Sequence, residues 1–126
     1  MKRSPALQPL SREHHTALTL AKACERVAQS RDEEQIAKTC QRVIRAFSDE
    51  LEPHFQIEEQ SLLPILRSAE MQPLVQRTMA DYQQLRALLD GLRQHNIEAL
   101  DSFGKGLSDH VRFEERELFP VIERLL

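Results

Sequence analysis

Residues 54–64 read HFQIEEQSLLP, and residues 110–120, which begin 56 positions later, read HVRFEERELFP. Both stretches share the pattern H-x-x-x-E-E-x-x-L-x-P. Positions i and i+4 of an α-helix lie one turn apart on one face, so each copy stacks an imidazole over a carboxylate. Two such helices packed face to face would bring two imidazoles and two carboxylates into one interior. Those groups are ligand types of non-haem iron, manganese or zinc.

The composition around these two copies favours helix, because glycine is scarce and Ala, Leu, Gln, Glu and Arg are abundant. We expect a first helix that begins after an N-cap at Ser11 and ends near Gln29. The S-x-x-E sequence that begins at Ser30 has the form of a capping box and predicts the start of a second helix. Pro53 and Pro64 fall inside the apolar pattern of that helix, so we expect kinks there and not helix ends.

The second half of the chain predicts two more helices. Pro73 suits the first turn of a third helix, and Asn96 can cap a fourth. Gly104 and Gly106 are expected to fray or bend the start of the fourth helix. Four amphipathic helices with short connections predict an all-α, antiparallel up-down-up-down four-helix bundle made of two similar hairpins.

Length and charge narrow the class of protein. With 126 residues the chain is expected to form one domain over residues 1–126. The net charge of −3 comes without a basic stripe, so no nucleic-acid partner is expected. No apolar stretch is long enough for a membrane span or a secretory signal, which favours a cytoplasmic protein. Cys24 and Cys40 are interpreted as reduced core residues, with a redox pair at one end of the bundle as the alternative.

The apolar stripe of the second and fourth helices contains His54, Glu58, His110 and Glu114. One unpaired carboxylate in such a core costs roughly several kcal/mol, and here there are two. A bound metal ion would convert both carboxylates into ligands, and neutral imidazoles would complete a mixed nitrogen and oxygen ligand set. The alternatives are a metal-free network of buried ion pairs, and a bundle whose solvent-exposed face carries the motif.

The chain resembles hemerythrin-like (HHE cation-binding) domains over essentially its whole length. The family pattern is a histidine on the first helix, H-x-x-x-E on the second, a histidine on the third and H-x-x-x-E or D on the fourth. His14, which follows Glu13, supplies the first element here. The resemblance implies a bundle around two non-haem iron ions with an oxo or hydroxo bridge. It implies bridging roles for Glu58 and Glu114, and it makes His14, His54 and His110 terminal ligands.

The third helix departs from the family pattern, because Tyr82 stands where a histidine is expected and Thr78 lies one turn earlier. Three arrangements could compensate: Tyr82 binds metal as a phenolate, water fills the position, or the second metal position binds weakly. A fourth alternative is that the Tyr82 hydroxyl donates a hydrogen bond to the site without binding metal.

Several neighbouring residues are candidates for supporting roles. His15 lies about 100° from His14 around the helix and is interpreted as peripheral, with a reversal of the two roles as the alternative. Glu59 and Glu115 are expected at the surface or against a ligand, and Glu115 remains an alternative ligand on a distorted helix. Asp81 could orient a ligand or replace Tyr82.

These residues favour a small iron-binding module that binds, senses or stores dioxygen, nitric oxide or iron. A small diatomic or peroxide ligand is the expected partner, and manganese or zinc could replace iron. No phosphate-binding loop or nucleophile elbow is present, and a small bundle leaves little room for a large organic substrate. One alternative is a redox enzyme that acts on peroxide, nitric oxide or ferrous iron. Another is a structural or regulatory bundle that holds zinc or no metal.

Overall fold

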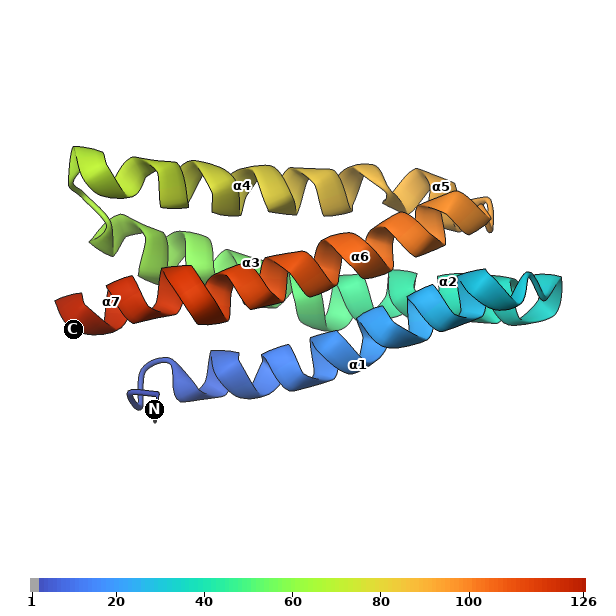
Figure 1. Cartoon of the computed structure of the whole chain (residues 1–126), viewed down its shortest axis with the longest axis horizontal. Helices are drawn as coiled ribbons and strands as arrows, with labels where there is room; N and C mark the ends of the chain where they lie inside the picture. Colours follow the sequence, from blue (N-terminus) through green and yellow to red (C-terminus); the bar gives the residue numbers. More distant parts are fainter. Residues whose placement is uncertain (1–2) are drawn as a thin grey trace.

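The computed structural model describes residues 3–126, and these form four helical rods that run back and forth along one axis (Figure 1). Residues 1 and 2 of the expected domain lie outside the described range. The first rod is α1 (Gln8–Ser30), and the third is α4 (Gln72–Ala87) continued by α5 (Leu89–Arg93). The second and fourth rods contain more than one helix type. The second consists of α2 (Glu33–Ala46), η1 (Phe47–Leu51), α3 (Glu52–Ile57), η2 (Glu58–Leu62) and η3 (Leu63–Ile65). The fourth consists of α6 (Ile97–Phe113), η5 (Glu114–Leu118) and α7 (Phe119–Leu125).

The all-α four-helix bundle predicted from the sequence is confirmed. A short 3-10 turn, η4 (Ala69–Met71), connects the second rod to the third, and both ends of the chain lie at the same end of the bundle (Figure 1). Within residues 3–126, no helix is long and apolar enough to cross a membrane.

Two of the four expected helix starts are confirmed, and two are wrong. Pro73 lies in the first turn of α4, and the Asn96 side chain accepts a hydrogen bond from the Ala99 amide at 2.8 Å. The first helix begins at Gln8, before Ser11. The Ser11 hydroxyl does not cap the helix but donates a hydrogen bond to Glu115. The second helix is capped by Asp32, whose side chain accepts from two backbone amides.

Ser30 does not cap the second helix because its side chain belongs to the end of the first. Its hydroxyl donates to the Val27 carbonyl at 2.6 Å and accepts from the Asp32 amide at 3.2 Å. The capping-box sequence therefore marks the turn between the two helices, but the capping residue is two positions further on.

Three prolines follow a common local arrangement. The π-helical segments η1, η2 and η5 each end two residues before a proline, namely Pro53, Pro64 and Pro120. A proline ring clashes with the carbonyl four residues earlier in a regular helix, and a widened π turn displaces that carbonyl. The helix continues past Pro53, as expected. Pro64 lies in the 3-10 turn that ends the second rod, so the expectation that the helix would continue past Pro64 with a kink is wrong.

Gly104 permits a close approach of α6 to α1. A Cβ atom at this position would lie 2.7 Å from the Ala21 carbonyl oxygen and 2.9 Å from Cβ of Cys24. Helix α6 is continuous from Ile97 to Phe113, so the expected fraying near Gly104 and Gly106 is wrong. Glycine serves here to bring two backbones together.

The core has two apolar clusters with a polar layer between them. One cluster contains Cys24, Cys40 and Phe103, and the other contains Leu10, Phe119 and other residues near the chain ends. Both cysteines are free and fully buried, and burial raises the pKa of the Cys24 thiol to about 12. This environment matches the interpretation of the cysteines as core residues. The polar layer contains the candidate site.

Candidate metal centre

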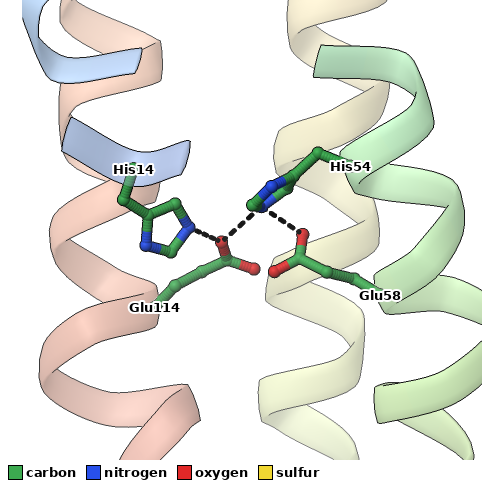
Figure 2. Close-up of side chains that lie close together, drawn as sticks. All are labelled: His14, His54, Glu58 and Glu114. Atoms are coloured by element: carbon green, nitrogen blue, oxygen red, sulfur yellow. Dashed lines mark hydrogen bonds and ion pairs between the residues drawn. The ribbon is translucent and has the colours of Figure 1, made fainter. Parts of the chain in front are cut away.

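The two repeated blocks place their histidines and glutamates inside the bundle, next to His14 of α1. His54 comes from α3 and Glu58 from η2, while His110 comes from α6 and Glu114 from η5. Each of these five residues is at most 4% exposed. Figure 2 shows the side chains of His14, His54, Glu58 and Glu114 pointing toward one another, with His54 and Glu58 on the same helical rod. Each of the four offers a ligand atom within 4.8 Å of the others.

The Nε2 atoms of three imidazoles face one oxygen of Glu114. The distances to Glu114 Oε1 are 2.8 Å from His14, 3.4 Å from His110 and 3.9 Å from His54. His54 Nε2 also lies 3.4 Å from Glu58 Oε1. The i,i+4 spacing within each block therefore stacks the imidazole over the carboxylate as the sequence predicts. Packing of α1 adds the third imidazole.

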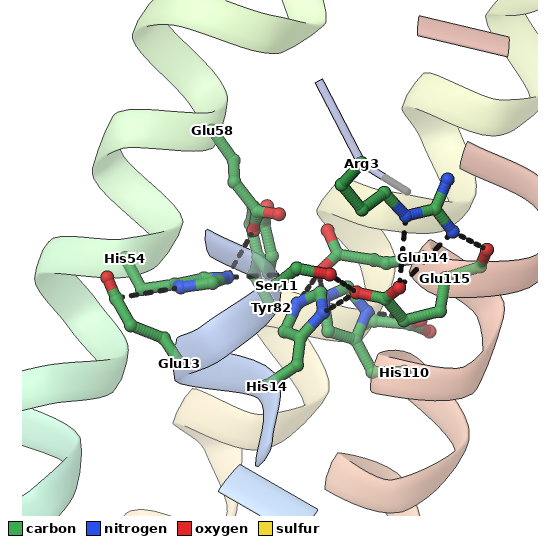
Figure 3. Close-up of polar contacts among 11 residues, drawn as sticks. Arg3, Ser11, Glu13, His14, His54, Glu58, Tyr82, His110, Glu114 and Glu115 are labelled. Atoms are coloured by element: carbon green, nitrogen blue, oxygen red, sulfur yellow. Dashed lines mark hydrogen bonds and ion pairs between the residues drawn. The ribbon is translucent and has the colours of Figure 1, made fainter. Parts of the chain in front are cut away.

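The opposite ring nitrogens point away from this centre toward a second set of carboxylates (Figure 3). Nδ1 of His14 lies 2.6 Å from Glu115 Oε2, and Nδ1 of His54 lies 3.3 Å from Glu13 Oε2. Nδ1 of His110 lies 2.8 Å from Asp81 Oδ2. A carboxylate that accepts the Nδ1 proton fixes the ring and leaves the Nε2 lone pair available, which is the usual arrangement behind a metal-binding histidine.

Tyr82 contacts the site through a hydrogen bond. Its hydroxyl donates to Glu58 Oε1 at 2.6 Å, and its ring stacks on Phe55 with the centroids 4.2 Å apart. Burial and the nearby charge of Glu58 raise the pKa of the phenol. Thr78 is turned away, since its hydroxyl donates to the Leu74 carbonyl of its own helix. Of the arrangements considered from the sequence, this contact corresponds to the tyrosine as hydrogen-bond donor.

The two buried glutamates have opposite electrostatic environments. Burial, together with the charge of Glu114, raises the pKa of Glu58. Burial also acts to raise the pKa of Glu114, but the charge of His110 and hydrogen bonds to its carboxylate hold that pKa well below its usual range. The surroundings therefore favour the negative charge on Glu114 over a negative charge on Glu58.

In the metal-free protein, the carboxylates around the imidazoles favour the protonated form of the rings. Burial lowers the pKa of His54 and His110, but the nearby carboxylates outweigh it and raise these values to about 10 and about 9. The pKa of His14 is raised as well, because hydrogen bonds to Glu114 and Glu115 outweigh its burial. Protons thus occupy the ligand atoms that a metal ion would need, so metal binding would release protons.

A family model for the hemerythrin HHE cation-binding domain matches residues 6–122. The chain belongs to this family. Comparisons with curated proteins and with solved structures found no significant match. The hemerythrin-like resemblance drawn from the two sequence blocks is therefore confirmed, and with it the assignment of this domain to a cation-binding class.

The buried polar atoms of this hemerythrin-like domain fit a metal ion. Four side-chain atoms in the centre are buried without a hydrogen-bond partner: Nε2 of His54 and of His110, Oε2 of Glu58 and of Glu114. Buried polar groups are normally satisfied, and each unsatisfied one costs about 1–3 kcal/mol. Imidazole nitrogens and carboxylate oxygens are ligands that divalent transition metals accept. These nitrogen and oxygen atoms therefore suit a metal cation, in agreement with the cation-binding family of the chain.

The other candidates lie at the edge of the centre. His15 is exposed, and Glu59 pairs with Arg86 at 3.5 Å. Glu115 and Asp81 contact histidines from outside. Their roles as Nδ1 partners match the orienting function that the sequence allowed for them.

Sequence reasoning missed the partners supplied by α1 and by the segment before it. Glu13 is the sequence neighbour of His14, yet its carboxylate contacts Nδ1 of His54. Ser11 donates to Glu115 Oε2 at 2.6 Å, and Arg3 contacts the same carboxylate at 3.2 Å (Figure 3). Glu13 precedes His14 directly, but only the packing of α1 against α3 shows which histidine it serves.

Proposed function

We propose that this protein is a non-haem di-iron module that binds dioxygen or nitric oxide, or senses or stores iron. The observation that carries the proposal is the set of four unpartnered buried atoms from two histidines and two glutamates, with the His14 Nε2 atom beside them. Membership of a cation-binding family supports the same conclusion. Iron is proposed because carboxylate-rich bundle cores with histidines on facing helices suit iron pairs.

The two proposed iron positions are unequal. His14, His54, Glu58 and Glu114 offer mutually close ligand atoms, which makes two imidazoles and two carboxylates for the first ion. The second position would share both carboxylates but has only His110 from the remaining histidines. Tyr82 occupies the place of the family's third-helix histidine and donates to Glu58. We therefore propose that the first ion binds tightly and the second weakly.

The surroundings of the centre support a small ligand. A cavity of about 310 Å³ adjoins the site, at the lower end of the range for pockets that hold organic ligands. Its walls include Ala17, Leu20 and Val111, which suit a small neutral molecule. When bound, ferrous iron supplies reversible binding or reduction of diatomic ligands; the protein supplies the fixed imidazoles and a largely apolar chamber.

Turnover of peroxide or nitric oxide is the competing function. It is favoured by the poor ligand supply on the His110 side, because an open coordination position supports redox chemistry. The two functions differ in whether the ligand is returned unchanged.

Optical spectroscopy of the ferrous-loaded protein tests the proposal. Addition of nitric oxide under anaerobic conditions should give a new visible spectrum that reverses when the gas is removed. Glu114→Gln should abolish the spectrum, whereas Glu117→Gln, an exposed residue of the same segment, should preserve it. Consumption of nitric oxide or peroxide over many cycles would support the enzyme instead. An iron-loaded protein that binds neither nitric oxide nor dioxygen would refute the ligand-binding function.

A further inference from the structure

The carboxylates around the centre divide into two groups by their partners. On most sides they are paired with arginine. Arg3 contacts Glu115 at 3.2 Å, and Arg77 contacts Asp81 at 3.2 Å. The same pairing holds beside η2, where Arg86 contacts Glu52 at 2.7 Å and Glu59 at 3.5 Å.

The cavity beside α1 and η1 has a different rim. Glu13, Asp49 and Glu50 line it, and all three are exposed. Within residues 3–126, none of the three forms an ion pair with lysine or arginine; Glu13 contacts only His54, at 3.3 Å, and its side chain is 47% exposed. No lysine or arginine lines this cavity. Asp49 and Glu50 at the opening therefore have no cationic partner among the described residues, whereas Glu115, Asp81, Glu52 and Glu59 are each paired with an arginine.

The inner end of the same cavity reaches the candidate ligands. Its lining includes His14, His54, His110 and Glu114, and three of these residues carry buried atoms without a hydrogen-bond partner. Glu13 connects the two ends, since its carboxylate is partly exposed and lies against the His54 ring (Figure 3). From the surface to the centre, the cavity is thus lined first by Asp49 and Glu50, then by Glu13, and finally by the candidate ligands with unpartnered atoms.

We propose that this cavity is the entry route for the metal ion, and that Asp49 and Glu50 attract a divalent cation to its mouth. The inference rests on the proposed metal site and adds how the site is filled. Clefts lined by charge of one sign raise the local concentration of the opposite ion and accelerate its association. The arginine pairs fit this route, because they neutralise Glu115, Asp81, Glu52 and Glu59, whereas Asp49 and Glu50 at the opening have no such partner in the part of the chain that the structure describes.

The rate of metal uptake tests the route. Metal-free protein is mixed with cobalt(II), whose visible absorption changes on entry into a nitrogen and oxygen ligand set. The variant D49N/E50Q keeps side-chain size and removes two charges at exposed positions. We expect its uptake at low ionic strength to be slower by about three- to tenfold, and the difference to shrink in 1 M salt, where charges are screened within about 3 Å. The final cobalt content should be unchanged.

The matched control is E70Q/E117Q. These glutamates are exposed, do not line the cavity and form no ion pair within the described residues, and the change in net charge is the same. Its uptake should stay within about twofold of wild type. Equal slowing in both variants, or no slowing in D49N/E50Q, would overturn the route while leaving the metal site intact. A wild-type protein that takes up no cobalt, zinc or ferrous iron would refute the metal site, and the route with it.

Discussion

The two copies of H-x-x-x-E-E have the same spacing and opposite surroundings. Glu114 of the second copy meets the imidazoles of His14 and His110 and is ionised, whereas Glu58 of the first copy accepts a hydrogen bond from Tyr82 and has a raised pKa. Both glutamates begin a π-helical segment, so the difference does not arise within the copies. It arises from the facing helix, which supplies a histidine from α1 to one copy and a tyrosine from α4 to the other.

The copies also differ in the glutamate that follows. Glu115 contacts Nδ1 of His14 and is held by Arg3, whereas Glu59 contacts Arg86 at the surface. The duplicated motif therefore gives one copy whose glutamate is ion-paired with histidines and one copy whose glutamate accepts a hydrogen bond from a tyrosine. Replacing the two glutamates one at a time should reveal this difference.

The largest expected effect is on the metal-free stability of Glu114→Gln. This change leaves buried imidazolium groups without their carboxylate, and breaking a buried pair in this way costs about 3 kcal/mol or more. The surroundings of Glu58 disfavour its ionised form, and an amide has a similar shape, so Glu58→Gln should cost clearly less, about 1 kcal/mol. Urea unfolding at pH 7 measures both. Equal losses would mean that the two glutamates carry the same charge.

The pH dependence of the metal-free protein should follow the histidines that face Glu114. The pKa values of His54 and His110 are raised to about 10 and about 9 in the folded state, above the ordinary value of 6.5. Their contribution to stability is fully present below pH 6.5 and is lost as pH rises through 9 to 10. We expect the free energy of unfolding to fall by several kcal/mol between pH 7 and pH 10.

Two variants sharpen this second prediction. The decline should persist in Glu58→Gln and become much smaller in Glu114→Gln, because the imidazoles then lack their main anionic partner. It should also shrink in zinc-loaded protein, whose imidazoles would be held by metal and not by protons. A metal-free stability that rises from pH 7 to pH 10 would contradict the assignment of charges.

The outer carboxylates should affect metal affinity less than the ligands do. Asp81 lies 2.8 Å from His110 Nδ1 with 16% of its side chain exposed, while Glu13 lies 3.3 Å from His54 Nδ1 and is 47% exposed. Removing such a partner typically costs 10- to 100-fold in affinity. We expect Asp81→Asn to weaken zinc binding about tenfold and Glu13→Gln about threefold. Competition with a chelator measures the zinc affinity of both variants, with Glu117→Gln as the control. A larger loss of affinity in Glu13→Gln than in Asp81→Asn would show that burial does not set the importance of the outer carboxylates.

Tyr82→Phe should have a small effect on stability and none on the spectrum. The variant loses one hydrogen bond to Glu58, which is worth about 1 kcal/mol of stability. If the hydroxyl is only a donor, the visible spectrum of the ferric-loaded protein should be the same in wild type and variant. A strong charge-transfer band in wild type that disappears in Tyr82→Phe would establish a tyrosinate ligand and make the two copies more alike.

Features set by periodicity and spacing could be predicted from the sequence. The i,i+4 pairs His54–Glu58 and His110–Glu114 and the apolar stripes fix the interior face of a helix, and Pro73 and Asn96 act through local geometry. The departure at Tyr82 was visible because the family pattern defines what should stand there. These features depend only on residues close together in the chain.

Features that depend on competition between partners could not be predicted. Ser11 and Ser30 have the chemistry of N-caps, but Glu115 and the Val27 carbonyl provide better partners. The pairing of each histidine with its outer carboxylate joins residues up to 101 positions apart, so no local pattern reports it. The unpaired acidic rim became visible only when the arginines on the other sides could be placed.

Metal content per chain after anaerobic reconstitution with ferrous iron tests the central claim most directly. We expect about two irons per chain in wild type and little iron in Glu114→Gln. During dialysis against a chelator, the iron on the His110 side should be lost before the other one. Tight binding of a single ion would confirm the centre and limit it to the position of His14, His54, Glu58 and Glu114. A wild-type protein that retains no metal would contradict the account and leave a buried network of protonated histidines and carboxylates in its place.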